Sequence, residues 1–483
     1  MIERIKELEE LSRLLDPDEK RRNDWNSRVL AYANSFLNNL GEAKVYQTSN
    51  GIDRESIYDY DISEQGVDLD LLLGGIKKNI DTPGINAASG GHLGYIPGGG
   101  IYPAALGDYL AAVTNRYAGI FYAAPGAVKL ENMLIRWMCR LMGFPSDAAG
   151  NLTSGGSIAN LTAVITAREA ASLKARDFHR AVIYLSKEAH HSLQKALKIA
   201  GLAEAQIRYI PLDEDLKLSV DALKTAIEED KSNNLIPFFI NASLGTTNTG
   251  TVDPIGPIGR IAADYKIWFH VDAAYGGFFK LVDECSPAFN GVEKADSITL
   301  DPHKGLFLPF GTGAVLIKDH KAVHNAHHYM ADYLQDAEGG NENVISEEVS
   351  PADVSPELTK HFRGLRVWLP LKLFGLKAFR AALEEKIYLA RYFQEQVQQV
   401  PGFEIGPGPD LSIGIFRYVP KNQDANKFNQ WLLEEILEDG RIFLSSTTID
   451  GVFWIRVAVL SFRAHLKQID LALKIIKEKA EGL

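Results

Sequence analysis

The chain has 483 residues, 46% of them hydrophobic and 23% charged, which is typical of a soluble globular protein too long for one hydrophobic core. Its 51 lysines and arginines against 62 aspartates and glutamates give a net charge of −11, which argues against nucleic acid or an anionic membrane as the main partner. Two distant cysteines, Cys139 and Cys285, exclude a disulfide-rich secreted protein. With neither a signal-peptide core nor an apolar run of membrane-spanning length, we expect a cytoplasmic protein.

The first hundred residues divide into two parts. Residues 1–75 carry helical patterning, in which Gly41 is expected to end a helix. The stretch INAASGGHLGYIPGGGIYP (85–103) is too rich in glycine for regular structure and too long for a simple turn.

From about 104 to 320, helical segments alternate with short apolar, β-branched runs. These runs lie at 181–186, 207–210, 235–243, 267–274, 297–300 and 314–318. Strands that are continuously apolar and separated by helices predict a mainly parallel sheet covered on both faces.

After about residue 365 the pattern changes. A long helix is expected at roughly 376–400, followed by alternating strands and helices and a last helix at 465–480. We therefore predict three parts: a helical segment (1–80), a large α/β domain (81–365) and a small α+β domain (366–483).

Polar and small residues follow several of the predicted strands. His190 follows the run 181–186, Thr246 follows 235–243, and Asp272 lies at the end of the next run. Lys304 follows 297–300 in the sequence DPHK, and Gly156 and Ser157 open a helix upstream. Ligands of open α/β sheets bind at the carboxyl ends of the strands, so we expect these residues at one edge.

Each of these residues has an ordinary structural explanation when taken alone. Gly-Gly-Ser most often caps a helix, His190 can bond a carbonyl at a helix end, and Thr246 can shape a turn. Only Asp272 with Lys304 favours a functional interpretation without further support. Together, however, the residues suit one cofactor, pyridoxal phosphate.

The chemistry of pyridoxal phosphate explains the residue types. A desolvated lysine stays neutral and nucleophilic, so Lys304 is predicted to bond the aldehyde. Asp272 would keep the pyridine nitrogen protonated, so that the ring accepts electrons. The phosphate needs backbone N–H groups at a helix start. The other predicted contacts are stacking by His190, close approach by Ala274, and phosphate donors from Gly156, Ser157, Ser297 and His303.

The order TSGGS, AHHS, LGTT, HVDAAYGG and ADSITLDPHKG closely resembles the group II pyridoxal-phosphate amino-acid decarboxylases, such as the aromatic amino-acid, glutamate, histidine and tyrosine decarboxylases. The resemblance covers roughly residues 80–375. It implies the type I aminotransferase-like fold and an obligate homodimer in which the N-terminal helices wrap the partner. It also implies that Lys304, Asp272 and His190 are catalytic, and that Gly156, Ser157, Thr246 and His303 contact the cofactor.

The chain departs from that family in a loop. The aromatic enzymes carry, in a mobile loop, a tyrosine that reprotonates the substrate carbon, but residues 336–360 contain no tyrosine. Tyr329 and Tyr333 precede the loop and are expected to be packing residues. Either another acid such as His190 donates the proton, or oxygen intercepts the reaction and an aldehyde forms.

The expected substrate wall is apolar. It contains Tyr95, Ile96, Pro97 and Ile120, and residues 83–103 contain neither lysine nor arginine to hold a second carboxylate. A bulky neutral, aromatic L-amino acid is therefore the expected substrate.

Other functions were weighed against decarboxylation. A carbon–carbon lyase of the phosphosphingolipid-lyase type uses the same fold, and a catalytically silent scaffold would keep the fold without the chemistry. The intact set of Lys304, Asp272 and His190 argues against the scaffold. A zinc site at His324, His327 and His328 is rejected because no cysteine or carboxylate completes it.

Overall fold

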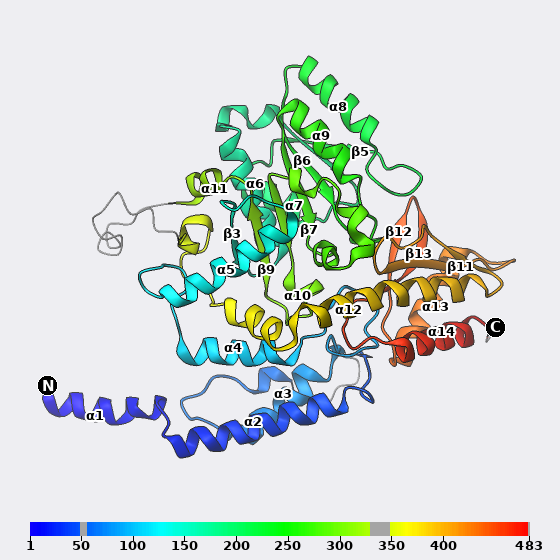
Figure 1. Ribbon diagram of the computed structural model, residues 1–483. Helices are drawn as coiled ribbons and strands as arrows, with labels where there is room; N and C mark the ends of the chain where they lie inside the picture. Colours follow the sequence, from blue (N-terminus) through cyan, green and yellow to red (C-terminus); the bar gives the residue numbers. More distant parts are fainter. Residues whose placement is uncertain (49–55, 329–347, 482–483) are drawn as a thin grey trace.

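The computed structural model describes residues 1–48, 56–328 and 348–481. These residues form a large α/β unit, a smaller sheet with its helices, and an N-terminal helical segment (Figure 1). The expected α/β class, with a mainly parallel central sheet and a smaller C-terminal unit, is confirmed. Whether 1–80, 81–365 and 366–483 fold as separate domains stays a prediction.

The large sheet has seven strands in the order β3-β9-β8-β7-β6-β4-β5. Neighbours from β8 to β5 are parallel, whereas β9 runs antiparallel to both of its neighbours. The strands are β3 (Ala149–Thr153), β4 (Ala181–Ser186), β5 (Gln206–Ile210), β6 (Ile236–Ser243), β7 (Trp268–Ala273), β8 (Ser297–Leu300) and β9 (Gly313–Ile317). All six predicted runs coincide with strands, but β3, with the short sequence AGNLT, was missed because it lacks an apolar run.

Both faces of this sheet are covered, as the side chains of β4 illustrate. Alternate residues of a strand point to opposite faces. Ile183 and Leu185 pack with α6 (Gly156–Ala170) and α7 (Ser192–Ile199). Val182 and Tyr184 pack on the other face with α8 (Val220–Ser232) and α9 (Ile255–Tyr265). Burial on both sides explains why the strand is apolar at every position but its last.

The smaller sheet is antiparallel, in the order β10-β11-β13-β12. Its strands are β10 (Phe403–Ile405), β11 (Ile413–Tyr418), β12 (Ser445–Ile449) and β13 (Val452–Ala458). Helices α13 (Ala425–Asp439) and α14 (Leu466–Glu481) pack on it. The predicted helix 376–400 corresponds to the second part of α12 (Gly364–Gln398), which follows a kink at Gly375, where φ is 67° and ψ 162°; a shorter helical part precedes the kink.

The N-terminal segment contains α1 (Ile2–Ser12), α2 (Glu19–Asn39) and α3 (Leu69–Ile76). Figure 1 shows these helices along one side of the molecule, beside α4 (Tyr102–Thr114). All residues of α1 and α2 are described, and none of them is buried.

Residues 336–347 of the loop predicted at 336–360 lie outside the described residues, as do Tyr329 and Tyr333. Its described end, from residue 348, contacts α5 (Pro125–Met142), where the Asn132 amide donates to Glu348 Oε2 at 2.8 Å. Within the described ranges, every helix is too short or too polar to cross a membrane.

Candidate active site

A cavity of about 280 Å³ opens at the carboxyl edge of the large sheet. Four of its parallel strands, β4, β6, β7 and β8, end there, so residues distant in sequence meet. The predicted cofactor residues that line it are Gly156, Ser157, His190, Thr246, Asp272, Ala274, His303 and Lys304. Eight of the nine predicted cofactor residues thus meet at one cavity, whereas Ser297 lies elsewhere, and the roles of the eight stay predictions.

Lys304 lies on α10 (Pro302–Gly305), a single helical turn directly after β8. Its Nζ forms an ion pair with Asp301 Oδ2 at 3.0 Å. The glycine-rich segment packs directly on this turn, since a Cβ on Gly98 would lie 2.5 Å from the His303 carbonyl oxygen. Gly98 thus permits a close approach of the two backbone segments.

Asp272 lies at the carboxyl end of β7 and is buried. Its Oδ2 accepts a hydrogen bond from the Asn160 amide at 3.0 Å, and its Oδ1 accepts one from the Ala274 backbone N–H at 3.1 Å. The two donors fix the orientation of the carboxyl group. Asn160 also binds Thr299 on β8, whose hydroxyl donates to its Oδ1 at 2.6 Å, so two strands and α6 position the carboxylate.

The imidazole of His190 is oriented by Ser192. The backbone N–H of Ser192 donates to Nδ1 at 3.2 Å, and the Ser192 hydroxyl lies 2.7 Å from the same nitrogen. This network assigns the ring proton to Nε2 in the neutral form. Burial lowers the pKa of His190, although the charge of Asp272 opposes the effect.

Ser297 does not reach the cavity, which corrects the expectation that it contacts the phosphate. It lies at the amino end of β8 and is fully buried. Its Oγ accepts from Trp268 Nε1 and faces His270 Nδ1, both at 2.8 Å. His270 Nε2 lies 3.1 Å from Asn160 Oδ1. Ser297 therefore belongs to a buried network with Trp268, His270 and Asn160 instead of the cavity wall.

The start of α6 fits a phosphate group. Gly155 precedes it with φ 153° and ψ 174°, a conformation that essentially only glycine adopts. Within the described residues, the backbone N–H groups of Gly156 and Ser157 have no hydrogen-bond acceptor. The His303 ring lies beside Gly155, since a Cβ there would be 3.5 Å from its Cε1. Free donors at the positive end of a helix are what a phosphate dianion requires.

Sequence reasoning missed several residues of the cavity wall, among them the polar residues Asn160, Asp301 and Glu188. Asn160 is a buried amide in α6, and Asp301 stands in the DPHK motif itself. Glu188 precedes His190 by two residues, and burial raises its pKa. Each carried a signal, a polar residue next to a recognised one, but only the fold shows which of them face the cavity.

The predicted substrate wall is only partly at this cavity. Ile96 lines it, whereas Tyr95, Pro97 and Ile120 are not among its described lining residues. Tyr95 is exposed and packs on Phe443, with ring centroids 5.5 Å apart. The substrate roles of these residues stay predictions.

A family model described as the pyridoxal-dependent decarboxylase conserved domain matches residues 53–419. The chain is 34% identical to an aromatic-L-amino-acid decarboxylase of Bacillus atrophaeus, with 87% of each protein covered. It is 29% identical to a phenylacetaldehyde synthase of Petunia hybrida, over 97% of this chain and 95% of that protein.

Among solved structures, tryptophan decarboxylase of Catharanthus roseus superposes with a TM-score of 0.88 over 97% of this chain and all of that one, at 24% identity. That likeness shows the fold. The family match covers most of the chain and includes the lysine, aspartate and glycine-rich helix start described above. The chain therefore belongs to the pyridoxal-dependent decarboxylase family, and it is an enzyme whose cofactor is pyridoxal phosphate.

Proposed function

We propose that the enzyme removes the α-carboxyl group of an aromatic L-amino acid and releases the amine and CO₂. One observation carries the choice of substrate. Among the described residues that line the cavity, Lys304 is the only lysine or arginine, so no second cation is available there for a side-chain carboxylate. Glu188 and Asp301 add negative charge to the same wall, and Ile96 makes part of it apolar. An acidic side chain is therefore disfavoured.

We assign the following roles to the residues of the cavity. When bound, pyridoxal phosphate supplies an electron-withdrawing ring that takes up the electrons left by the departing carboxyl group. Lys304 holds the cofactor covalently, and Asp272 holds a proton at the ring nitrogen. Gly156 and Ser157 bind the phosphate through their N–H groups. His190, which lines the same cavity, would stack on the ring and would move a proton at the substrate's α-carbon.

The test is a substrate panel with a matched variant. We expect kcat/KM for L-phenylalanine, L-tyrosine or L-tryptophan to exceed that for L-glutamate by at least ~10²-fold, since a buried carboxylate without a partner is costly. Ile96→Lys adds a cation to the wall and should narrow this gap, whereas Ile96→Leu should not. Faster turnover of L-glutamate by the parent enzyme would refute the assignment.

A second candidate product is an aldehyde. Residues 336–360 contain no tyrosine, and a phenylacetaldehyde synthase is among the similar proteins. Assaying amine, aldehyde, hydrogen peroxide and oxygen uptake in the same reaction separates the two outcomes. Stoichiometric aldehyde and peroxide would make the aldehyde the main product.

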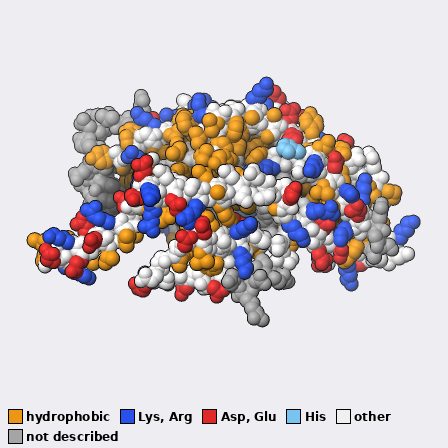
Figure 2. All heavy atoms as spheres, turned by 90° about the horizontal axis from the view of Figure 1, so that it is seen from below, with side chains coloured by type: hydrophobic (Ala, Val, Ile, Leu, Met, Phe, Trp, Pro, Cys, Tyr) orange, Lys and Arg blue, Asp and Glu red, His pale blue; other side chains and the backbone are white. Residues whose placement is uncertain are grey.

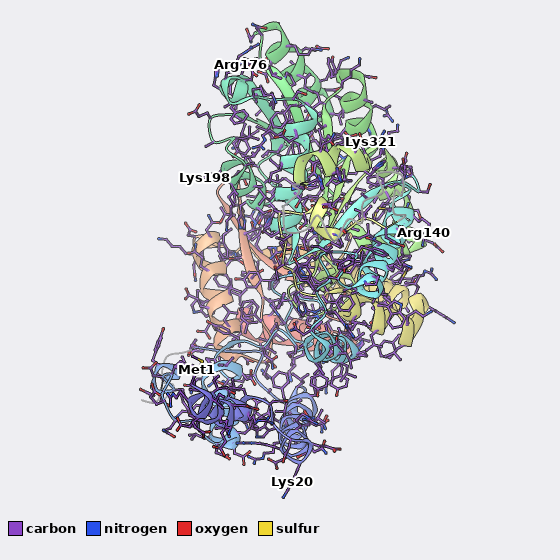
Figure 3. All side chains as sticks on the ribbon, turned by 90° about the vertical axis from the view of Figure 1, so that its left-hand side faces the viewer. Met1, Lys20, Arg140, Arg176, Lys198 and Lys321 are labelled. Atoms are coloured by element: carbon purple, nitrogen blue, oxygen red, sulfur yellow. The ribbon has the colours of Figure 1, made fainter. Side chains whose placement is uncertain are left out.

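We also infer that the enzyme works as a homodimer. Apolar side chains of α1 and α4 face outward, namely Ile5, Leu8, Leu11, Leu106, Leu110 and Val113. Figure 2 shows hydrophobic side chains gathered over the centre of the lower face, and Figure 3 shows Met1 and Lys20 at the end of the molecule beyond the main body. Apolar faces of this extent favour a partner surface, and the family resemblance favours a second copy.

The dimer is tested by light scattering. The parent should have twice the chain mass, and Leu8→Asp with Leu11→Asp should weaken the dimer, whereas Glu7→Asp with Glu10→Asp on the same helix should not. A monomeric and fully active parent would contradict the inference.

We place the enzyme in the cytoplasm. Cys139 and Cys285 are both free and buried, which suits a reducing compartment. Recovery of activity from the cytosolic fraction of its source cells is the check.

A further inference from the structure

Asp301 occupies an unusual position at the start of α10. It is the N-cap residue of that helix, yet its side chain makes no capping hydrogen bond. Aspartate at an N-cap ordinarily accepts from a backbone N–H of the first turn. Here Oδ2 instead lies 3.0 Å from Lys304 Nζ and 3.6 Å from His303 Nε2. The carboxylate is directed at the lysine, in place of the local interaction that its position favours.

The carboxylate is deeply buried and incompletely bonded. Its side chain is 3% exposed, and among the described residues Oδ1 has no hydrogen-bond partner. The fold makes space for it at the start of α6, where a Cβ on Gly156 would lie 3.1 Å from Oδ2. A buried charge with one orphaned oxygen is costly unless an opposite charge faces it. Lys304 supplies that charge.

Charged and titratable groups from several elements face this pair. His303 belongs to α10, His190 and Glu188 follow β4, and Asp272 ends β7. Burial lowers the pKa of both histidines, so they add little positive charge near neutral pH. Glu188 and Asp272 are themselves carboxyl groups, so they do not offset the charge of Asp301. Lys304 is the counter-charge that the cavity offers to Asp301.

We propose that Asp301 is the counter-ion that holds the free Lys304 side chain as an ammonium group, and so favours its displacement by the incoming amino acid. The inference rests on the proposed attachment of the cofactor to Lys304. One aldehyde carbon holds one amine nitrogen, so Lys304 and the substrate exclude each other. As the protonated carbon–nitrogen double bond to Lys304 is replaced by one to the substrate, the substrate nitrogen would go from three hydrogens to one and the Lys304 nitrogen from one to three, so two protons would pass from the substrate ammonium group to Lys304. Atoms and charge balance, and Asp301 stabilises the protonated lysine.

Asp301 is thus a positioning residue that acts through Lys304. Without its charge, the displaced lysine would stay neutral over more of the pH range and would compete with the substrate. The expected signature is a raised KM for the amino acid with a smaller change in kcat. A merely structural residue would not change the protonation of one particular lysine.

The first experiment needs neither cofactor nor substrate. Full-length protein depleted of cofactor is labelled with acetic anhydride between pH 6 and 10, and mass spectrometry follows the Lys304 peptide. In Asp301→Asn, the pH of half-labelling should fall by about 1 unit or more, as expected for loss of an adjacent opposite charge. Glu188 lines the same cavity but forms no ion pair with Lys304 among the described residues. Glu188→Gln should therefore shift the pH of half-labelling of Lys304 clearly less.

A second neutral variant guards against misfolding. Asp301→Ser can form the N-cap hydrogen bond that the aspartate does not make, and it should shift the half-labelling pH in the same direction. Asp301→Glu keeps the charge and should restore most of the parent behaviour. An unchanged half-labelling pH in folded Asp301→Asn or Asp301→Ser would overturn the proposal.

The charge of Asp301 also acts on the phosphate group of the cofactor. A further experiment separates this effect from the effect of Asp301 on Lys304. Pyridoxal and pyridoxal phosphate are each bound to the depleted parent and Asp301→Asn, and covalent attachment is followed by absorbance across pH. Both aldehydes should attach at lower pH in the variant. A change confined to pyridoxal phosphate would mean that Asp301 acts on the phosphate, against the proposal. If Lys304 labelling shifts but borohydride fixes the cofactor to another lysine, the proposed function fails while the ion pair stands.

Discussion

Lys304 and Lys360 each lie beside a buried carboxylate, but the surroundings of the two ammonium groups differ. Lys360 is completely buried and pairs with Glu131 Oε2 at 3.2 Å. It also donates to Asn151 Oδ1 and to the Leu152 carbonyl oxygen. The Glu131 Oε1 accepts from two backbone N–H groups at 3.0 and 3.1 Å. The lysine has three partners, and it is not among the described residues that line the cavity of the candidate active site.

Lys304, by contrast, keeps 21% of its side chain exposed and has Asp301 as its ion-pair partner. It faces the cavity, and one oxygen of its carboxylate partner is orphaned. The difference teaches how to tell two kinds of buried lysine apart. A saturated ammonium group fixes the path of the chain, whereas an unsaturated one beside a cavity has bonding capacity left for a ligand.

The largest predicted effect tests this contrast directly. Lys304→Ala should abolish the absorbance of the attached cofactor and all turnover. It also removes the counter-charge of Asp301, so it should destabilise cofactor-depleted protein, but less than the loss of Lys360 does, because the Lys304 side chain is 21% exposed and faces the cavity. Lys360→Met should instead lower the free energy of unfolding by about 3–5 kcal/mol, because it leaves Glu131 buried and uncompensated. Spectra, activity and denaturant unfolding of both variants are the measurements.

Borohydride provides the control for this pair, because it fixes the cofactor to the lysine that holds it. The labelled peptide should contain Lys304. Label on any other lysine, or a Lys360→Met variant as stable as the parent, would break the comparison.

Asp272 sharpens the contrast, because it lies at the cavity with both oxygens bonded. Asp272→Asn should reduce turnover by at least ~10²-fold, comparable to loss of one strong electrostatic contact in an active site. The cost in stability should be small, because the new side chain keeps a carbonyl oxygen for the Asn160 amide. Near-normal activity with retained cofactor would contradict the role proposed for the charge.

Much of this site could be predicted because the end of each apolar run in the sequence indicates the end of a strand. The apolar runs located β4, β6, β7 and β8, and a shared edge for their carboxyl ends then follows from parallel pairing. The failure at Ser297 has the same origin. It begins β8 instead of ending it, so its side chain lies deep among buried groups.

Side-chain direction accounts for what the sequence did not show at other positions. Asp301 belongs to the DPHK motif, but an aspartate directly before a helix is ordinarily an N-cap. The sequence does not show that its carboxylate faces Lys304 instead. Tyr95 and Ile120 were expected at the substrate wall from the family pattern. Their contacts depend on how separate loops pack, which no local pattern encodes.

His190 lies between the two lysines in this respect, because it lines the cavity while its Nδ1 is hydrogen-bonded to Ser192. If it moves the proton at the substrate's α-carbon, His190→Asn should raise the aldehyde-to-amine ratio in air more than it lowers cofactor affinity. A positioned acid contributes about 10²–10⁴-fold to such a transfer. Product analysis with a peroxide assay is the measurement, and His191→Asn, at the neighbouring exposed position, is the matched control. Amine formation at the parent rate without peroxide would require another proton donor.

The smallest predicted effect on activity is that of His92→Phe. This variant tests whether buried polar atoms without hydrogen-bond partners indicate a function when they lie away from the cavity. His92 is buried against Phe443, with ring centroids 5.2 Å apart, and neither ring nitrogen has a partner among the described residues. It is not among the residues that line the cavity. We therefore expect His92→Phe to leave kcat/KM nearly unchanged. Its effect on stability at neutral pH should be small, because relief of the unpaired nitrogens opposes the larger volume of the phenyl ring.

The effect of His92 on stability should depend on pH. Burial lowers the pKa of His92 to about 4, below the ordinary value of about 6.5 that it regains on unfolding. Between these values the unfolded chain binds more protons, so the parent loses stability as the pH falls through this window. His92→Phe lacks this contribution, and near pH 5 it should gain about 2 kcal/mol relative to the parent. The buried His270 acts equally in both proteins and cancels. Denaturant unfolding at several pH values is the measurement, and a parent–variant difference that stays constant from pH 7 to pH 5 would contradict the burial argument.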